Sequence, residues 1–302
     1  YLDDNNYGYV SLDEIAVFKH GKKASITFNA LPKDKSYAQK EGYTFFMEKE
    51  IYEQGAVVSE TIMGRVKNHK VTLENLDDEY LKNIDDVVLC ACGTSYHAAL
   101  VASYLFERLA KVRTKVEVAS EFRYRKPYLN KNSLFIVISQ SGETADTLEA
   151  LRIAKEAGLR TLAICNVDNS SIVRLADNTL LTRAGIEKGV ASTKAFATQI
   201  IVLWMLVLQM ASAKGSISKK ELDHEIKTLL HIPQILNINN SLQEKLHRLS
   251  KHYLHGHGFF FIGRDIFYPL ALEGALKLKE ISYLHAEGYP SGEMKHGPIA
   301  LA

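Results

Sequence analysis

The stretch Leu134–Thr144, LFIVISQSGET, is the part of the sequence that decides the fold. Its first half is an unbroken apolar run, and its second half is a polar loop with three hydroxyl side chains and one glycine. Short apolar runs bounded by turn residues are typical of strands buried on both faces, as in a parallel sheet. The stretch therefore predicts a strand and a loop that leads into a helix, expected at 144–157.

The same alternation of strand and helix continues on both sides of this stretch. Further helices are expected at 95–110, at 192–210 and in a longer helical region at 219–252. Apolar, β-prone runs predict strands at Val87–Ala91, Lys115–Ala119, Leu134–Ile138, Thr161–Cys165 and Thr179–Leu181. Strands that alternate with helices predict an α/β fold, a doubly wound parallel sheet flanked by helices.

A second unit of the same kind is expected near the end of the chain. Phe259–Gly263 repeats the apolar run and glycine of Val87–Gly93. In the first unit the motif EFRY begins at Glu121, 28 residues after the glycine, and in the second EMKH begins at Glu293, 30 residues after it. The two offsets predict a tandem duplication, with the second copy incomplete at the end of the sequence.

The composition excludes several classes of protein. The 302 residues exceed what one compact core usually holds, and the net charge of +2 gives no broad field for nucleic acid or an anionic membrane. The apolar run Ile200–Leu208 is far shorter than the roughly twenty residues of a membrane span, so we expect a core helix. Three cysteines without metal-ligand spacing indicate a reducing, cytoplasmic setting and no metal site.

The first residues of the chain alternate short β-prone runs with turn residues. His20-Gly21-Lys22 lies between Glu14–Phe18 and Ala24–Phe28, which predicts a hairpin. Two or three strands do not form a stable domain alone, so we expect them to be the end of a larger β-containing unit. A polar, charged linker follows at 33–45, and a helix containing Phe46 and Ile51 comes after it.

Two polar loops follow strands of the predicted sheet. They are Cys92–Ser95 and Ser139–Thr144, and a third segment, Gly189–Lys194, opens the helix expected at 192–210. Hydroxyl side chains, glycines and the free N–H groups of a helix start form a cradle for phosphate. Because GxxxxGK[ST] is absent, a phosphate monoester is favoured over a nucleoside triphosphate. The alternative is that these serines only form turns and cap helices.

Several motifs closely resemble the glucosamine-6-phosphate synthase family. They are LCACGTSYHAA, ASEFRYRKP, ISQSGETADTL, GVASTKAFATQ, ALEGALKLKEISYLHAE and GEMKHGPIAL. The family has two sugar-isomerase (SIS) domains in tandem behind a glutaminase domain, and the resemblance covers residues 46–302. It implies the last strands of a truncated glutaminase domain at 1–32, a linker at 33–45, a first SIS domain at 46–235 and an incomplete second one at 236–302.

The resemblance also implies the residues of the site. Glu280, Lys277 and His296 match catalytic positions of the family. The matched substrate-binding and further active-site positions are Thr94, Ser95, Ser139, Gln140, Ser141, Thr144, Val190, Ser192, Glu273 and Arg264. Cys92 is expected at the pocket wall rather than as a nucleophile, because no histidine partner lies within its motif.

The spacing of the helix residues fits the chemistry without requiring it. Glu273, Lys277 and Glu280 lie four and three residues apart, so they share one face of a helix expected to start at Pro269. A carboxylate beside a cation is a suitable base for moving a proton between C1 and C2, and His296 suits ring opening. The alternatives are a solvated Glu–Lys helix pair and a structural histidine.

By resemblance, the chain is expected to bind fructose 6-phosphate, aminate it with glutamine-derived ammonia and isomerise it to glucosamine 6-phosphate for amino-sugar synthesis. The family implies a cytoplasmic homodimer in which the neighbouring subunit donates His296, and it implies no metal, nucleotide or pyridoxal cofactor. The family's glutaminase nucleophile is an N-terminal cysteine, so a chain that starts with Tyr1 is expected to lack glutaminase activity. An imine-forming lysine of the family's C-terminus is not among these motifs, so complete turnover is not expected.

Two other functions remain open at this point. One is a regulatory SIS module that binds a sugar phosphate, which would keep the serine loops but have no use for Glu280 and His296. The other is a stand-alone phosphosugar isomerase, although such proteins usually have a single SIS unit. A glutaminase-like N-terminal segment and a duplicated unit favour the synthase family over both.

Overall fold

The computed structural model describes residues 2, 5–26 and 39–301. The chain divides into two compact units, with the boundary between residues 39 and 40. The first contains an antiparallel sheet in the order β1-β2-β3, with strands Asn6–Val10, Ile15–Lys19 and Lys22–Lys23. Residues 33–38 of the linker expected at 33–45, and residues 27–28 of the expected strand, lie outside the described residues.

The hairpin of this unit turns where the sequence predicts, but its second strand is elsewhere. His20 and Gly21 both have positive φ, 49° and 78°, as a two-residue hairpin turn of the primed type requires. This tight turn places Lys22 opposite Lys19, so pairing begins at once and β3 ends at Lys23. The strand expected at Ala24–Phe28 is therefore wrong over its described residues, 24–26.

The second unit contains a five-stranded sheet in the order β10-β9-β8-β6-β7. All of its neighbouring strands are parallel, and the predicted doubly wound α/β fold is confirmed. The strands are β6 (Asp86–Ala91), β7 (Arg113–Val118), β8 (Ser133–Ser139), β9 (Arg160–Cys165) and β10 (Asn178–Leu181). A separate small hairpin pairs β4 (Val66–Lys67) with β5 (Lys70–Val71).

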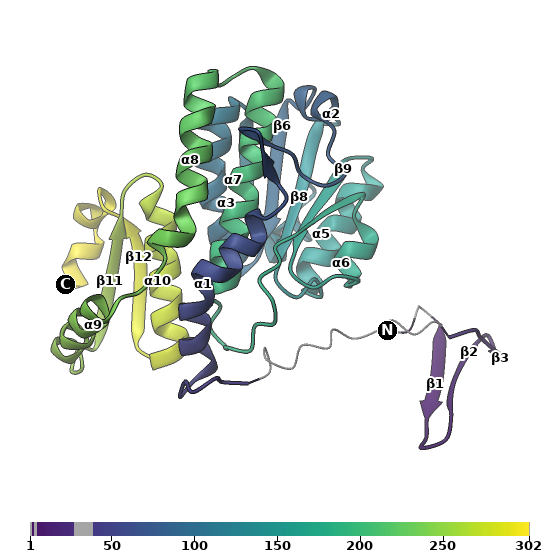
Figure 1. Cartoon of the computed structure of the whole chain (residues 1–302), viewed down its shortest axis with the longest axis horizontal. Helices are drawn as coiled ribbons and strands as arrows, with labels where there is room; N and C mark the ends of the chain where they lie inside the picture. Colours follow the sequence, from purple (N-terminus) through teal and green to yellow (C-terminus); the bar gives the residue numbers. More distant parts are fainter. Residues whose placement is uncertain (1, 3–4, 27–38, 302) are drawn as a thin grey trace. The chain divides into compact units, whose positions relative to one another are not determined.

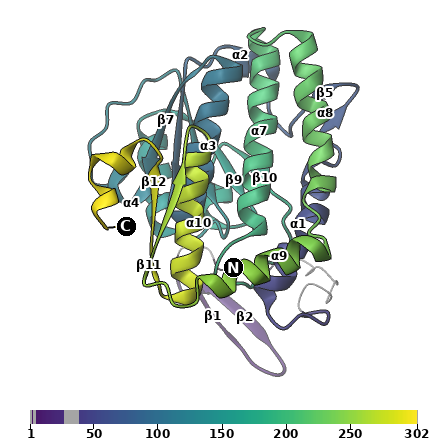
Figure 2. The same cartoon turned by 90° about the vertical axis from the view of Figure 1, so that its left-hand side faces the viewer.

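Helices cover both faces of this sheet, as Figures 1 and 2 show. Alternate residues of β6 face opposite cores, with Val87 and Leu89 in one cluster and Val88 and Cys90 in the other. The first cluster includes α1 (Phe46–Ile62), α2 (Asp78–Lys82), α3 (Gly93–Leu105), the π-helical turn η2 (Phe106–Ala110), α7 (Lys194–Lys214) and α8 (Lys219–Ile235). The second includes α4 (Ala119–Phe122), α5 (Ala145–Glu156) and α6 (Ser171–Leu175).

Helix α7 is the central helix of the first face. It is long and apolar enough to cross a membrane by length and composition, but 72% of its apolar window is buried inside the fold. Its residues Val202, Leu206 and Met210 are fully buried in the first core cluster. The core helix expected around Ile200–Leu208 is confirmed.

A second strand–helix–strand unit begins at Gly258. β11 (Gly258–Gly263) pairs in parallel with β12 (His285–Pro290) across α10 (Phe267–Ser282), as β6 pairs with β7 across α3. The short helices η3 (Glu293–His296) and η4 (Pro298–Leu301) come next. The order β11, α10, β12 repeats the order β6, α3, β7, as the duplication predicts. Helix α10 packs against α3, so the β11–α10–β12 and β6–α3–β7 segments contact each other (Figure 2).

Among the helix boundaries that differ from the expectation, two have a local cause. The region expected at 219–252 is two helices, because the side chain of Asn239 caps a new helix, α9 (Asn240–His252), by accepting from Leu242 N. Helix α10 begins at Phe267 rather than Pro269. Proline is tolerated in this first turn because its missing N–H would have no intrahelical partner there.

Candidate functional site

The predicted phosphate loops meet where the chain reverses its direction across the sheet. Strand β6 lies between β7 and β8, so the connections from β6 to β7 and from β7 to β8 pass on opposite sides. Ligands bind at such switch points, beyond the carboxyl ends of the strands. A cavity of about 240 Å³ lies here, and it is lined by Cys92, Thr94, Ser95, Ile138, Ser139, Gln140, Ser141, Thr144, Thr147, Ser192 and Gln199.

Two helices begin at this cavity without a capping side chain. The residues that precede α3 and α5 are Cys92 and Thr144, and neither side chain accepts a hydrogen bond from its helix. The first N–H groups of a helix have no intrahelical partner, and the helix dipole makes this end positive. Two uncapped helix starts beside one cavity favour an anionic ligand, such as a phosphate.

The serine loop between β8 and α5 is fixed by its own hydroxyls. Ser139 Oγ accepts from Gly142 N at 3.0 Å and lies 3.3 Å from Thr144 Oγ1, and Ser141 Oγ accepts from Glu143 N at 3.2 Å. These two serines do form a turn, as the alternative proposed, and each hydroxyl keeps an O–H to donate. Gly142 has a φ of 68°, and a Cβ there would lie 1.9 Å from Ser170 Oγ.

Two polar residues of the cavity wall were not predicted from the sequence. Thr147 and Gln199 are each 1% exposed, and within the described residues Thr147 Oγ1 and Gln199 Oε1 have no hydrogen-bond partner. Gln199 Nε2 donates to Ser95 Oγ at 3.0 Å. An unpaired buried polar atom is costly, so both atoms suit a polar ligand. The sequence offers only weak signals for them: Thr147 is the third residue of α5, and Gln199 directly precedes the apolar run Ile200–Leu208.

Helix α10 presents a cluster of charged residues to Thr94, which stands in the wall of this cavity. Glu273 is 6% exposed, and its two carboxylate oxygens lie 2.9 Å from Thr94 Oγ1 and 2.7 Å from His97 Nδ1. Lys277 Nζ donates to the same Thr94 hydroxyl at 3.1 Å and lies 2.6 Å from Glu280 Oε2. Thr94 thus lines the cavity and contacts the predicted Glu–Lys cluster.

The burial of this cluster decides between two interpretations of its spacing. A solvated helix pair would leave both side chains exposed, whereas the side chains of Glu273 and Lys277 are 8% and 17% exposed. Both oxygens of Glu273 bond to protein groups, so this residue supports the cluster from within the fold. His97 was missed by the sequence analysis, although its spacing of three residues from Thr94 places both on one face of α3.

Within the described residues, three predicted residues belong neither to the cavity wall nor to the Glu273–Lys277–Glu280 cluster. Val190 is 94% exposed and does not line it. Arg264 and His296 are exposed, and in the described part of the chain their side chains make no hydrogen bond or ion pair. A role for His296 in a neighbouring subunit's site stays a prediction.

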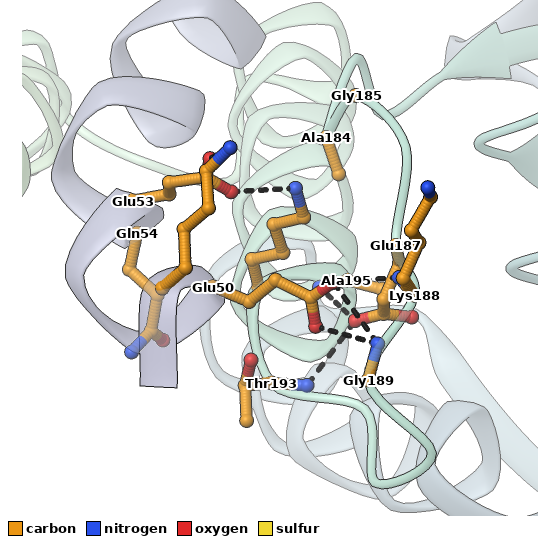
Figure 3. A network of polar contacts seen from close by, with 12 residues as sticks. Glu50, Glu53, Gln54, Ala184, Gly185, Glu187, Lys188, Gly189, Thr193 and Ala195 are labelled. Carbon is orange, nitrogen blue, oxygen red and sulfur yellow. Dashed lines mark hydrogen bonds and ion pairs between the residues drawn. The ribbon is translucent and has the colours of Figure 1, made fainter. Parts of the chain in front are cut away.

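A loop beside the cavity is held by a half-buried carboxylate, as Figure 3 shows. Glu187 Oε1 accepts from Thr193 N at 3.2 Å, from Ala195 N at 3.3 Å and from Ser192 Oγ at 3.1 Å. Burial raises the pKa of the Glu187 carboxyl above its ordinary value. Glu187 therefore caps α7 and fixes Ser192, which lines the cavity.

Two of the three cysteine thiols are buried in the fold. All three cysteines are free, and burial raises the pKa values of Cys90 and Cys165, so these thiols stay protonated. Cys92 is half-buried in the cavity wall, as predicted. Across residues 5–26 and 39–301, no three His, Cys, Asp or Glu side chains are grouped closely enough to hold a metal ion.

Comparisons with known proteins agree with this geometry. The sequence model of the SIS domain family matches residues 80–209 and 255–302. The chain is 64% identical over 302 residues to glutamine–fructose-6-phosphate aminotransferase [isomerizing] of Campylobacter jejuni and 52% identical over 300 residues to that of Helicobacter pylori. It spans about half the length of these curated relatives, covering 50% and 49% of them, while 100% and 99% of the chain is matched.

A solved structure is also similar. It is the C-terminal domain of glucosamine-fructose-6-phosphate aminotransferase from Francisella tularensis, at 45% identity and a TM-score of 0.84. The match covers 87% of this chain and 74% of that one. Together, these matches confirm the resemblance predicted from the motifs.

Proposed function

We propose, from the premise that the chain belongs to the SIS domain family, that it is the isomerising part of a glutamine–fructose-6-phosphate aminotransferase. It binds fructose 6-phosphate, receives ammonia from a glutaminase domain and yields glucosamine 6-phosphate for amino-sugar synthesis. In this proposal residues 1–32 end the glutaminase domain, and 46–235 and 236–302 belong to the two SIS domains. The enzyme is a cytoplasmic homodimer.

One observation carries the proposal. The serine-lined cavity lies between two uncapped helix starts, and Thr94 links it directly to the Glu273–Lys277–Glu280 cluster. Phosphate held by the helix starts and hydroxyls leaves the sugar carbons to extend toward the charged cluster. A binding module would need the first feature only.

The chemistry follows from this arrangement. Ammonia condenses with the C2 carbonyl of the open-chain ketose, and water leaves as a C2 imine forms. Glu280 removes a proton from C1 while the imine nitrogen takes up a proton, which gives an enaminol. A proton is then returned to C2 as the C1 hydroxyl loses its own, so C1 becomes the aldehyde and C2 carries the amino group of the product. Lys277, whose Nζ lies 2.6 Å from Glu280 Oε2, holds this carboxylate in place and stabilises negative charge on the sugar oxygens.

The test is Glu280→Gln in an enzyme of the relatives' full length that carries this chain. We expect near-normal binding of sugar phosphate and a loss of kcat of about 10²–10⁴, with deuterium exchange at C1 reduced in parallel. Glu244→Gln, the same change at an exposed position on α9, is the control. Exchange at the wild-type rate in Glu280→Gln would refute the role of Glu280. Binding without exchange in the wild type would instead support a regulatory module.

A further inference from the structure

The loop that carries Ser192 is anchored by helix α1, which precedes all strands of the five-stranded sheet. Glu50 of α1 is 3% exposed, and its Oε1 accepts hydrogen bonds from Lys188 N at 2.6 Å and from Gly189 N at 3.0 Å. Figure 3 shows the carboxylate of Glu50 directed at the backbone of this loop. A buried carboxylate that accepts backbone N–H groups is a strong and directional anchor.

The loop approaches α1 closely at Gly189. A Cβ at Gly189 would lie 2.5 Å from Glu50 Oε2, a distance that side-chain carbons do not adopt. One turn further along α1, Glu53 pairs with Lys194 at 2.8 Å, and Lys194 is 1% exposed. Helix α1 therefore holds the chain on both sides of Ser192, at 188–189 and at 194.

We infer that Glu50 is a positioning residue for the sugar-phosphate pocket. It does not line the cavity, and it acts by fixing the backbone at 188–189 so that Ser192 faces the cavity. Helix α1 lies before residue 80, where the match to the SIS family begins, so this support comes from outside the matched segments. The identity of the ligand rests on the proposed function.

The experiment compares Glu50→Gln with Glu60→Gln in the 302-residue chain. Both changes remove one carboxylate from α1, but Glu60 is exposed. Amide hydrogen exchange should become faster at Lys188 and Gly189 in Glu50→Gln alone, with the amides of β6 and β8 unchanged. Calorimetry with fructose 6-phosphate should show an affinity lower by about tenfold, the effect of one lost charge-assisted hydrogen bond.

A double-mutant cycle separates positioning from a general loss of stability. Ser192→Ala should weaken binding in the wild type and have little further effect in Glu50→Gln, because both changes remove the same contact. Gly189→Ala pushes the loop away from Glu50 without changing any charge, and it should reproduce the faster exchange and the weaker binding. It also provides the comparison if Glu50→Gln does not fold.

Unchanged exchange at Lys188 and Gly189 would overturn the inference. Faster exchange with unchanged affinity would also overturn it, because the loop would then not matter to the pocket. A wild-type chain that does not bind fructose 6-phosphate would refute the proposed function instead. In that case the exchange comparison alone decides whether Glu50 holds the loop.

Discussion

The hydroxyl of Thr94 donates a hydrogen bond of 2.9 Å to the carboxylate of Glu273, which lies 179 residues later in the chain. The same hydroxyl accepts a hydrogen bond of 3.1 Å from Lys277. Thr94 stands in the first turn of α3 and lines the cavity, whereas Glu273 and Lys277 belong to α10 of the second strand–helix–strand unit. A single hydroxyl thus connects the serine-lined cavity to the predicted catalytic cluster.

Thr94→Val should therefore weaken the contact between α3 and α10. Valine keeps the shape of threonine, but a buried oxygen of Glu273 loses its donor, which should lower the free energy of unfolding by about 1–3 kcal/mol. Urea denaturation measures this loss, with Thr228→Val on the exposed face of α8 as the control. In a Glu273→Gln background the loss should be much smaller. Equal losses in both backgrounds would show that the two residues do not interact.

Substitution of the loop serines should weaken ligand binding. Ser139→Ala combined with Ser141→Ala removes two hydroxyls from the cavity wall, so the binding free energy of fructose 6-phosphate should become less favourable by about 2–4 kcal/mol. Calorimetry measures the change, thermal unfolding checks the turn that these serines form, and Ser250→Ala on α9 is the control. Unchanged affinity in a well-folded double variant would remove this loop from the site.

Glu187 should make the stability of the chain depend on pH. Burial raises its pKa above the ordinary value of 4.5, so between 4.5 and the folded pKa the folded state binds more protons than the unfolded state. The contribution of this group to the free energy of unfolding is therefore largest below pH 4.5 and is lost as the pH rises through the folded pKa.

Glu187→Gln removes this titration and provides the measurement. Urea denaturation of both proteins from about pH 4 to about pH 7 should show the stability of the wild type falling relative to that of the variant. Glu48→Gln, at a half-buried position near the start of α1, should leave the wild-type trend in place. A wild-type advantage that stays constant or grows with pH would contradict the raised pKa.

His296 should act in the site of the neighbouring subunit. In enzymes of the relatives' full length, Glu280→Gln and His296→Ala should each be inactive as homodimers. After subunit exchange each mixed dimer has one intact site, so activity should return to about a quarter of normal when half of the dimers are mixed. Verified exchange without any recovered activity would place both residues in the same subunit's site.

The strands and loops were predictable because their signals are local. The apolar run of Leu134–Ile138 predicts a buried strand, and the hydroxyls of Ser139–Thr144 predict a polar turn directly after it. The hairpin strand at Ala24–Phe28 was mispredicted because the conformation of His20 and Gly21, which sets the register, is not visible in the pattern. The helix start after Asn239 was missed for a similar reason, because a cap depends on the backbone conformation of a few residues, which the apolar pattern does not show.

The connections of the site were not predictable from spacing. Nothing near Thr94 indicates a contact with Glu273, because this contact depends on the packing of α10 against α3. Gln199 resembles any polar residue on a core helix until its partner Ser95 and the cavity are known. Glu50 lies on a helix that the motifs do not reach, so its bonds to the loop at Lys188 and Gly189 required the structure.

The most direct measurement of the central claim is a crystal structure of the 302-residue chain with fructose 6-phosphate. The account predicts the phosphate between the starts of α3 and α5, within hydrogen-bond distance of the hydroxyls of Ser139, Ser141 and Thr144. The sugar carbons C1 and C2 should then extend toward Glu280. A phosphate bound elsewhere, for example in the cavity that Arg108 and Lys220 line between η2 and α8, would contradict the account.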